Sequence, residues 1–336
     1  MPVTKIVNAR KDFERVVEEA RDALEAGLLV VLPTETVYGL AALYRYRRSV
    51  EKVFIVKNRP PEPLTIHFAK LNDVEDLVTN PHVLHRVWGR LWPGPLTLVL
   101  PATSGVPRVV TQGRPCVGLR APAHPLTLKV LELAGPVVMP SANVSGRPSP
   151  SSGWEAILEM FGRADLVIDA GECVEGLEST IVDLCSSPPR VLRLGPLRPE
   201  EISSLLGVSL EISGEALRSA RRKYSIAAKL VFVEGDPSNP RYVDRVIEVV
   251  KEAARRYRVC VLCRDSHLER YRSEGFEAIG FGERDVEAAR RIYAALRLAE
   301  VKNCEVVVAE CLADEGLGRA VNSRLRSAAW RVVKVF

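Results

Sequence analysis

The sequence is 336 residues long, and its 47% hydrophobic and 26% charged residues are typical of a globular protein rather than a disordered one. The formal net charge of +5 favours an anionic ligand but falls short of the dense basic patches of dedicated nucleic-acid-binding proteins. No apolar run is long enough for a membrane span and the N-terminal residues do not resemble a signal peptide, so we expect a cytoplasmic protein with no membrane partner.

The length predicts two domains, because a single hydrophobic core stops growing at about 250–300 residues. In the first, residues 1–206, short strands are interrupted irregularly by helices, which predicts an α/β domain with a twisted, mixed sheet. The expected helices are 13–26, 49–57, 82–91, 126–133 and 154–161, and the expected strands are 28–32, 65–68, 96–100, 117–120, 137–139, 166–168, 180–184 and 191–194.

Residues 207–228 contain no clear core segment and carry several basic side chains, which predicts a linker. From residue 229 to 336, strands alternate regularly with amphipathic helices, which predicts a Rossmann-like domain with a parallel, doubly wound sheet. The expected strands are 229–235, 259–263, 276–279, 304–309 and 331–335, and the expected helices are 241–256, 267–274, 286–299 and 317–329. The G-x-G-x-x-G motif is absent, so the likeness is one of architecture alone.

The seven cysteines are odd in number and scattered along the chain, so we expect no disulfide framework. Cys260 and Cys263 form one Cys-x-x-Cys, but a strand would turn them to opposite faces and no second pair completes a zinc site. Both are expected to be buried thiols that behave as small hydrophobic side chains.

Several common catalytic motifs are missing, and this directs attention to the remaining polar residues. The P-loop, G-x-S-x-G and H-E-x-x-H patterns are absent, which weighs against P-loop chemistry, a serine nucleophile and zinc-dependent hydrolysis. Lys57 and Arg59 end a predicted helix, whereas Ser141 and Asn143 follow an apolar strand. Each alone could be solvated surface or a turn cap, but together they predict a site for a phosphorylated or carboxylated small molecule.

Seven segments resemble, in order, the motifs of the YrdC-like family, over about residues 10–206. They are PTETVYGL at 33–40, KNRP at 57–60, WPGPLT at 92–97, RAPAHP at 120–125, PSAN at 140–143, ESTI at 178–181 and LRLG at 192–195. The second domain, with EGLG at 315–318 and NSRLR at 322–326, resembles that of the long, two-domain form of the L-threonylcarbamoyladenylate synthases.

The resemblance implies synthesis of L-threonylcarbamoyl-AMP from L-threonine, bicarbonate and ATP with release of pyrophosphate. This is the first step of the threonylcarbamoyladenosine modification beside the tRNA anticodon. It implies Mg²⁺ bound with ATP, no metal held by protein side chains, no tRNA in this step, and a downstream threonylcarbamoyl-transferase complex. Because both reactants are anions, positioning and charge neutralisation would dominate catalysis. Two alternatives remain open: an RNA-binding YrdC-like module without catalysis, and carbamoyl transfer of the kind used in hydrogenase maturation.

The resemblance also implies roles for individual residues. Lys57 and Arg59 would be the catalytic residues, and Lys57 would neutralise charge on the carbamate or phosphate. The L-threonine pocket would comprise Thr36, His67, Arg120, Ser141 and Ser179. The nucleotide contacts would comprise Arg59, Cys116, Asn143, Ser151, Arg193 and Tyr224, several of them through backbone atoms. The chain departs from the family in its shorter 61–64 segment and in the 217–224 part of the linker, where Tyr224 would belong to a lid.

Overall fold

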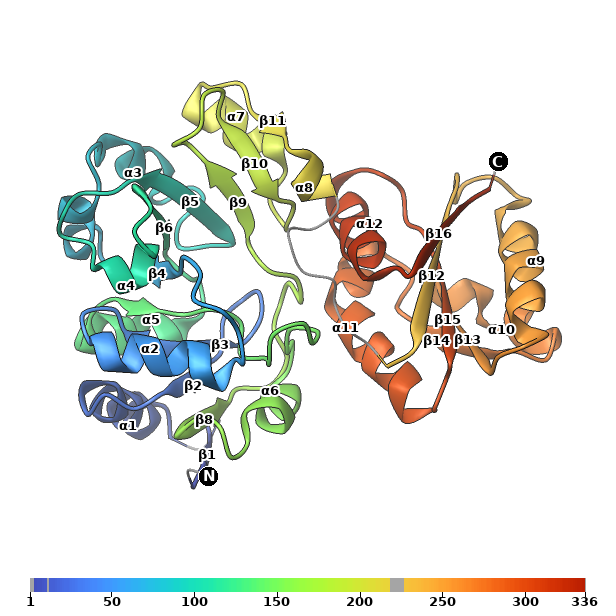
Figure 1. Cartoon of the computed structure of the whole chain (residues 1–336), viewed down its shortest axis with the longest axis horizontal. Helices are drawn as coiled ribbons and strands as arrows, with labels where there is room; N and C mark the ends of the chain where they lie inside the picture. Colours follow the sequence, from blue (N-terminus) through green and yellow to red (C-terminus); the bar gives the residue numbers. More distant parts are fainter. Residues whose placement is uncertain (1–2, 11, 218–226, 336) are drawn as a thin grey trace. The chain divides into compact units, whose positions relative to one another are not determined.

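The computed structural model describes residues 3–10, 12–217 and 227–335. The chain divides into two compact units, drawn in Figure 1. The first comprises Met1–Ser145 and Ser149–Ser213, and the second comprises Gly146–Pro148 and Gly214–Phe336. No helix in the described ranges has both the length and the apolar composition needed to cross a membrane.

The first unit is built on an 11-stranded mixed sheet with the strand order β1-β8-β2-β3-β7-β4-β6-β5-β9-β10-β11. Its strands are β1 (Lys5–Asn8), β2 (Val30–Leu32), β3 (Gly39–Leu43), β4 (Thr65–His67), β5 (Leu96–Pro101), β6 (Cys116–Arg120), β7 (Val137–Val138), β8 (Leu166–Asp169), β9 (Thr180–Asp183), β10 (Arg190–Arg193) and β11 (Glu211–Ile212). The predicted mixed sheet is therefore confirmed.

The helices of the first unit are α1 (Phe13–Glu25), α2 (Arg47–Val56), α3 (His82–Val87), α4 (Arg108–Thr111), α5 (Pro125–Ala134), α6 (Gly153–Met160) and α7 (Pro199–Leu206), with short 3₁₀ turns at Leu71–Asp73 and Glu75–Leu77. Several of them, such as α1, α2 and α6, pack against this sheet. Helix α1 begins where the Asp12 carboxylate accepts a hydrogen bond from the Arg15 amide, and it ends before Gly27, whose φ of 74° favours glycine. Side chains of α1 and α5 share one core cluster with β2, β3 and β8.

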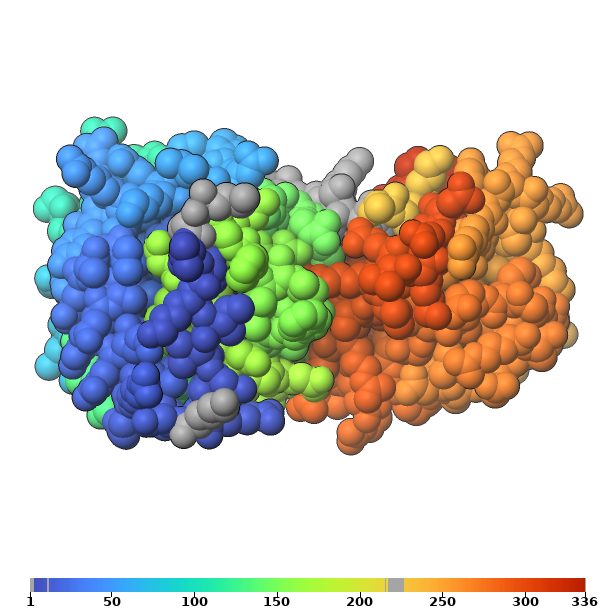
Figure 2. Space-filling view, turned by 90° about the horizontal axis from the view of Figure 1, so that it is seen from below, coloured from blue at the N-terminus to red at the C-terminus, as the bar shows by residue number. Residues whose placement is uncertain are grey.

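Three strands of this sheet were not predicted: β1, β3 and the two-residue β11, which falls in the segment expected to be a linker. Strand β3 begins at the last two residues of the motif 33–40 and continues beyond it. All its residues are buried, so no alternation of polar and apolar residues marks it. Strand β1 is mostly exposed and pairs in parallel with β8 at the edge of the sheet. Figure 2 shows this face of the first unit, where the N-terminal segment (blue) lies beside the segment around β8 and α6 (green).

The second unit contains a five-stranded sheet with the order β14-β13-β15-β12-β16, in which every recorded pairing is parallel. Its strands are β12 (Lys229–Glu234), β13 (Val259–Cys263), β14 (Glu277–Gly280), β15 (Val306–Glu310) and β16 (Arg331–Lys334), and its helices are α8 (Gly214–Leu217), α9 (Tyr242–Ala254), α10 (Leu268–Ser273), α11 (Asp285–Val301) and α12 (Gly316–Ala328), with a 3₁₀ turn at Asp265–His267. The predicted Rossmann-like architecture is confirmed. Strand β11 and helix α8 fall inside the segment expected to be a linker.

The expectation that the chain has no disulfides is wrong. Cys116 is bonded to Cys185 and Cys260 to Cys304, with Cα–Cα distances of 6.7 and 5.8 Å. Cys263 is a buried free thiol as expected, whereas Cys260 is not. The partners are 69 and 44 residues apart in sequence. They become neighbours only because strands pair, so spacing along the chain could not reveal them.

Candidate active site

A hydroxyl-lined turn between β2 and β3 forms one wall of the candidate site. Both the Thr36 and the Val37 amides donate to Thr34 Oγ1 at 3.1 Å, and Thr34 Oγ1 donates to the Val37 carbonyl at 2.6 Å. Thr36 Oγ1 lies 2.8 Å from Thr34 Oγ1. Because the Thr34 hydroxyl donates its proton to the Val37 carbonyl, the Thr36 hydroxyl must be the donor to Thr34 Oγ1. The Thr36 oxygen can then accept a hydrogen bond from another group.

Arg120, at the end of β6, is that donor. Its Nη2 lies 2.7 Å from Thr36 Oγ1 and 2.7 Å from Glu35 Oε1, and the other Glu35 oxygen accepts from the Ala123 amide at 2.9 Å. The Arg120 and Glu35 side chains are only 6% and 10% exposed. Sequence reasoning named Arg120 and Thr36 but missed Glu35. The available signal was that a buried guanidinium requires a counter-charge, and Glu35 is the acidic residue of its motif.

His67 is held neutral beside Arg120. Strand β4 pairs with β6 in a register that places His67 opposite Arg120. Burial lowers the pKa of His67 well below its usual value, and the positive charges of Arg120 and Arg193 lower it further. Its Nδ1 lies 3.3 Å from the Thr65 carbonyl oxygen, which can only accept. The proton is therefore assigned to Nδ1, and Nε2 carries a lone pair that can accept a hydrogen bond from a ligand.

Lys57 follows helix α2 and is 2% exposed. Its Nζ donates to the carbonyl oxygen of Ser141 and, at 2.8 Å, to that of Asn143. The Lys57 carbonyl in turn accepts from the Ser145 amide at 2.8 Å. The two segments that suggested an anion site are thus joined directly, and the ammonium group shapes the loop after β7 as well as adding positive charge.

Arg59 is placed by the end of the same helix. Its amide donates to the Phe54 carbonyl at 3.1 Å, and its guanidinium carbon lies 5.5 Å from the centre of the Phe54 ring. This cation–π contact keeps the charge near the helix end, two residues from Lys57.

Buried carboxylates hold the loop that contains the predicted nucleotide contacts. The amide and hydroxyl of Ser151 donate to Glu155 Oε2 at 2.7 and 2.9 Å, and the Ser149 hydroxyl donates to Glu178 Oε1 at 2.6 Å. Sequence reasoning missed both glutamates. A signal existed for Glu155, because Ser152 and Glu155 have the spacing of a helix capping pattern and the Ser152 hydroxyl does accept from the Glu155 amide.

Ser179, directly before β9, and Arg193, at the end of β10, meet further along the sheet, on the same side of β4 as Arg120. Arg193 donates from Nη2 to Ser179 Oγ at 3.0 Å and from Nε to the Ser179 carbonyl at 2.9 Å. The Ser179 hydroxyl also lies 2.8 Å from Thr97 Oγ1 on β5. A residue predicted to contact threonine is therefore held by one predicted to contact nucleotide.

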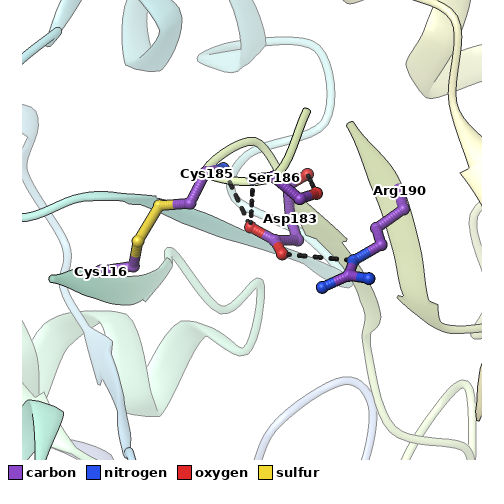
Figure 3. Close-up of a disulfide and its surroundings, with 5 residues drawn as sticks. All are labelled: Cys116, Asp183, Cys185, Ser186 and Arg190. Atoms are coloured by element: carbon purple, nitrogen blue, oxygen red, sulfur yellow. Dashed lines mark hydrogen bonds and ion pairs between the residues drawn. A yellow bond between two sulfur atoms is a disulfide. The ribbon is translucent and has the colours of Figure 1, made fainter. Parts of the chain in front are cut away.

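Cys116, another predicted nucleotide contact, forms a disulfide bond with Cys185 (Figure 3). The bond links the start of β6 to the segment after β9, where the Cys185 amide donates to Asp183 Oδ1 at 2.9 Å. The other Asp183 oxygen lies 3.6 Å from Arg190 Nε on β10. With the sulfur engaged, the backbone of Cys116 is the part that could contact a ligand.

Seven of the predicted residues therefore form three hydrogen-bonded groups, whereas Arg59, His67, Cys116 and Ser151 are held by other neighbours. The three groups are Thr36 with Arg120, Lys57 with Ser141 and Asn143, and Ser179 with Arg193. The Ala142 amide donates to the Tyr38 carbonyl at 2.8 Å, which connects the loop of the second group to the motif that contains Thr36. The positive charges of Arg120 and Arg193 both act on His67. Tyr224 lies outside the described residues. Buried cations beside hydroxyl groups suit a ligand with more than one anionic group.

Comparison with known proteins supports this interpretation. Residues 22–195 match the family described as "Telomere recombination", and residues 200–329 match "Threonylcarbamoyl-AMP synthase, C-terminal domain". A threonylcarbamoyl-AMP synthase of Pyrococcus abyssi is 36% identical over 99% of this chain and 100% of the relative. One of Bacillus subtilis is 32% identical over 93% and 92%. The crystal structure of P. abyssi Sua5 complexed with L-threonine matches with a TM-score of 0.87 and 35% identity, covering 99% of this chain and 100% of that one.

Proposed function

The chain belongs to the threonylcarbamoyl-AMP synthase family, and we propose that it makes L-threonylcarbamoyl-AMP from L-threonine, bicarbonate and ATP. The observation that carries this proposal is the buried Arg120, which lies beside Thr36 and the neutral His67 in a chain that aligns over 99% of its length with a threonylcarbamoyl-AMP synthase. Pyrophosphate and water are the other products, which balances the reaction.

The threonine pocket, in this proposal, is built around Arg120. Its guanidinium faces the substrate carboxylate, because a charge-assisted hydrogen bond is among the stronger recognition contacts in a buried site. His67 offers a lone pair to a hydroxyl or amine proton of the substrate. Thr36, Ser141 and Ser179 supply the surrounding hydroxyl groups. The solved relative bound to L-threonine supports this choice of ligand.

The nucleotide lies, we propose, along the loop after β7 and its neighbours. Arg59 and Arg193 supply charge, Asn143 and Ser151 supply polar contacts, Cys116 contributes its backbone, and Tyr224 remains the predicted lid contact. The carboxylates of Glu155 and Glu178 also lie close to this loop, but they accept hydrogen bonds from Ser151 and Ser149 respectively.

Among the residues that the structure describes, no group of three His, Cys, Asp or Glu could hold a metal ion. Mg²⁺ would therefore arrive on the phosphates of ATP.

The chemistry needs positioning more than acid–base catalysis. Threonine nitrogen becomes carboxylated, a carbamate oxygen then attacks the α-phosphorus of ATP, and the bond to pyrophosphate breaks. An anion thus approaches an anion, so fixed positive charge lowers the barrier. Lys57 acts in two ways in this proposal: it fixes the loop through the Ser141 and Asn143 carbonyls and it makes the local potential positive.

The proposed product is a labile mixed anhydride that requires a consumer. We propose a threonylcarbamoyl-transferase complex that modifies the adenosine beside the tRNA anticodon, with both steps in the cytoplasm where ATP and tRNA occur. tRNA itself is not needed for the first step.

Pyrophosphate release by the purified full-length chain tests the proposal. We expect release only when L-threonine, bicarbonate and ATP are all present, with threonylcarbamoyl-AMP detected by mass spectrometry. Release that persists at the same rate without threonine would show that the chain is a different kind of nucleotide hydrolase. Binding of double-stranded RNA that falls steeply with salt and ignores all three small molecules would favour the RNA-binding alternative.

A further inference from the structure

Arg120 and Glu35 form a buried ion pair between two loops that are far apart in the sequence. Glu35 lies in the turn after β2, whereas Arg120 ends β6, and Arg120 Nη2 lies 2.7 Å from Glu35 Oε1. In the described part of the chain this is the one ion pair recorded for Arg120. A pair this deeply buried is costly to form, so its presence calls for a reason beyond stability.

The donors of Arg120 show where a ligand would bind. Nη2 carries two hydrogens, and its two hydrogen bonds, to Glu35 and to Thr36, use both. Nε is also buried, yet it has no hydrogen-bond partner among the described residues. A buried N–H left without a partner is unfavourable, so this donor points to an acceptor brought by the substrate.

Glu35 also fixes the segment that follows Arg120. Its second carboxylate oxygen accepts from the Ala123 amide at 2.9 Å, and its backbone carbonyl accepts from the Glu175 amide at 2.7 Å. The side chain therefore has to reach Arg120 and Ala123 at once. The length of the Glu35 side chain therefore decides whether the Arg120 guanidinium is held in one orientation.

The charge of Glu35 works against the proposed ligand. Two carboxylates near one guanidinium repel each other, so a carboxylate at this position weakens the attraction between Arg120 and a substrate carboxylate. What Glu35 contributes must then be geometry. Resting on the proposed function, we propose that Glu35 is a positioning residue that orients Arg120 Nε toward the carboxylate of L-threonine, and that it acts through its reach rather than its charge.

Two variants separate reach from charge. Glu35→Asp keeps the charge but is one methylene shorter, so it cannot span Arg120 and Ala123 together. Glu35→Gln keeps the length and an oxygen that can accept from Nη2, although its amide NH2 can no longer accept from the Ala123 amide. We expect Glu35→Asp to weaken L-threonine binding on the order of 10-fold, as loss of a charge-assisted contact does, and Glu35→Gln to weaken it less. ATP affinity should stay within about 2-fold of wild type in both, because the nucleotide side is untouched.

The measurement is calorimetric titration of the full-length chain with L-threonine and with L-threoninamide, which lacks the carboxylate. Glu35→Asp should leave threoninamide binding unchanged, so the preference for threonine over threoninamide falls. A general loss of packing would weaken both ligands alike. Glu51→Asp is the matched control, because Glu51 pairs with Arg47 at the surface, where the side chains are 45% and 80% exposed.

Several outcomes would overturn the inference. They are unchanged threonine binding in Glu35→Asp, an equal loss of threonine and ATP affinity, and a larger loss in Glu35→Gln than in Glu35→Asp, which would assign the role to charge. If Glu35→Asp does not fold, Glu35→Gln decides: we expect its preference for threonine over threoninamide to stay near that of wild type, and loss of that preference contradicts the proposal. A wild-type chain that binds no L-threonine would instead overturn the proposed function, and this inference with it.

Discussion

The Lys57 ammonium nitrogen lies 2.8 Å from the carbonyl oxygen of Asn143. It also donates to the carbonyl oxygen of Ser141, so one cation at the end of α2 organises the whole turn after β7. Carbonyl dipoles attract a buried ammonium group and reduce the cost of its burial. This contact therefore couples the backbone of the proposed substrate loop to the residue proposed to supply positive charge.

Lys57→Met tests that coupling. We expect turnover to fall on the order of 100-fold or more, because both the fixed charge and the loop geometry are lost. The rate of pyrophosphate release at saturating substrates measures the effect. Lys52→Ala is the control, since Lys52 lies on the same helix but is exposed. Turnover in Lys57→Met equal to that of the control would refute a catalytic role.

Ser141 and Asn143 should affect different substrates. We expect Ser141→Ala to raise the KM for L-threonine several-fold more than the KM for ATP, because a neutral hydrogen bond to the amino acid is lost. Asn143→Ala should show the reverse preference. Both constants come from initial rates with the other substrates saturating. Parallel losses in the two variants would mean that the loop is a single unit and that the division into two pockets is wrong.

The Cys116–Cys185 disulfide should stabilise the first unit. It closes a long loop, because the partners are 69 positions apart in sequence. We expect the double variant Cys116→Ser/Cys185→Ser to lose about 2–4 kcal/mol of unfolding free energy under oxidising conditions. Denaturant titration gives this value. The same comparison in excess dithiothreitol is the control, and a difference that persists there would show that the disulfide is not its source.

His267 in the second unit should make stability depend on pH. Its Nδ1 lies 2.9 Å from Glu310 Oε1, and the side chains are 26% and 1% exposed. The hydrogen bond to Glu310 raises the pKa of His267 above its usual value despite partial burial. A raised folded-state pKa means that the pair stabilises fully below the unfolded-state pKa of about 6.5, and that this contribution is lost as pH rises through the folded-state value.

We therefore expect His267→Gln to lower the free energy of unfolding more at pH 6 than at pH 9, measured by urea denaturation. His85→Gln serves as the control, because His85 pairs with Glu75 at the surface, where its side chain is 57% exposed and such pairs contribute little. A destabilisation by His267→Gln that is equal at both pH values would argue against a charged pair.

Local patterns predicted most of the fold. In the second unit, apolar runs at 229–235 and 259–263 and amphipathic segments such as 286–299 correspond to β12, β13 and α11. Periodicity is a local property, so these elements could be read without knowing their neighbours. Strand β3 was missed because burial on both faces removes the alternation by which a strand is recognised.

The sequence by itself determined which residue types line the site: its motifs named Arg120, Thr36, Lys57 and Ser141, and the roles given to them stay predictions. Only the tertiary structure decided how they meet. Glu35 reaches Arg120 across 85 positions and Lys57 reaches Ser141 across 84. Such contacts depend on strand order and on the requirement that buried charges and carbonyls find partners, and neither leaves a periodic trace along the chain.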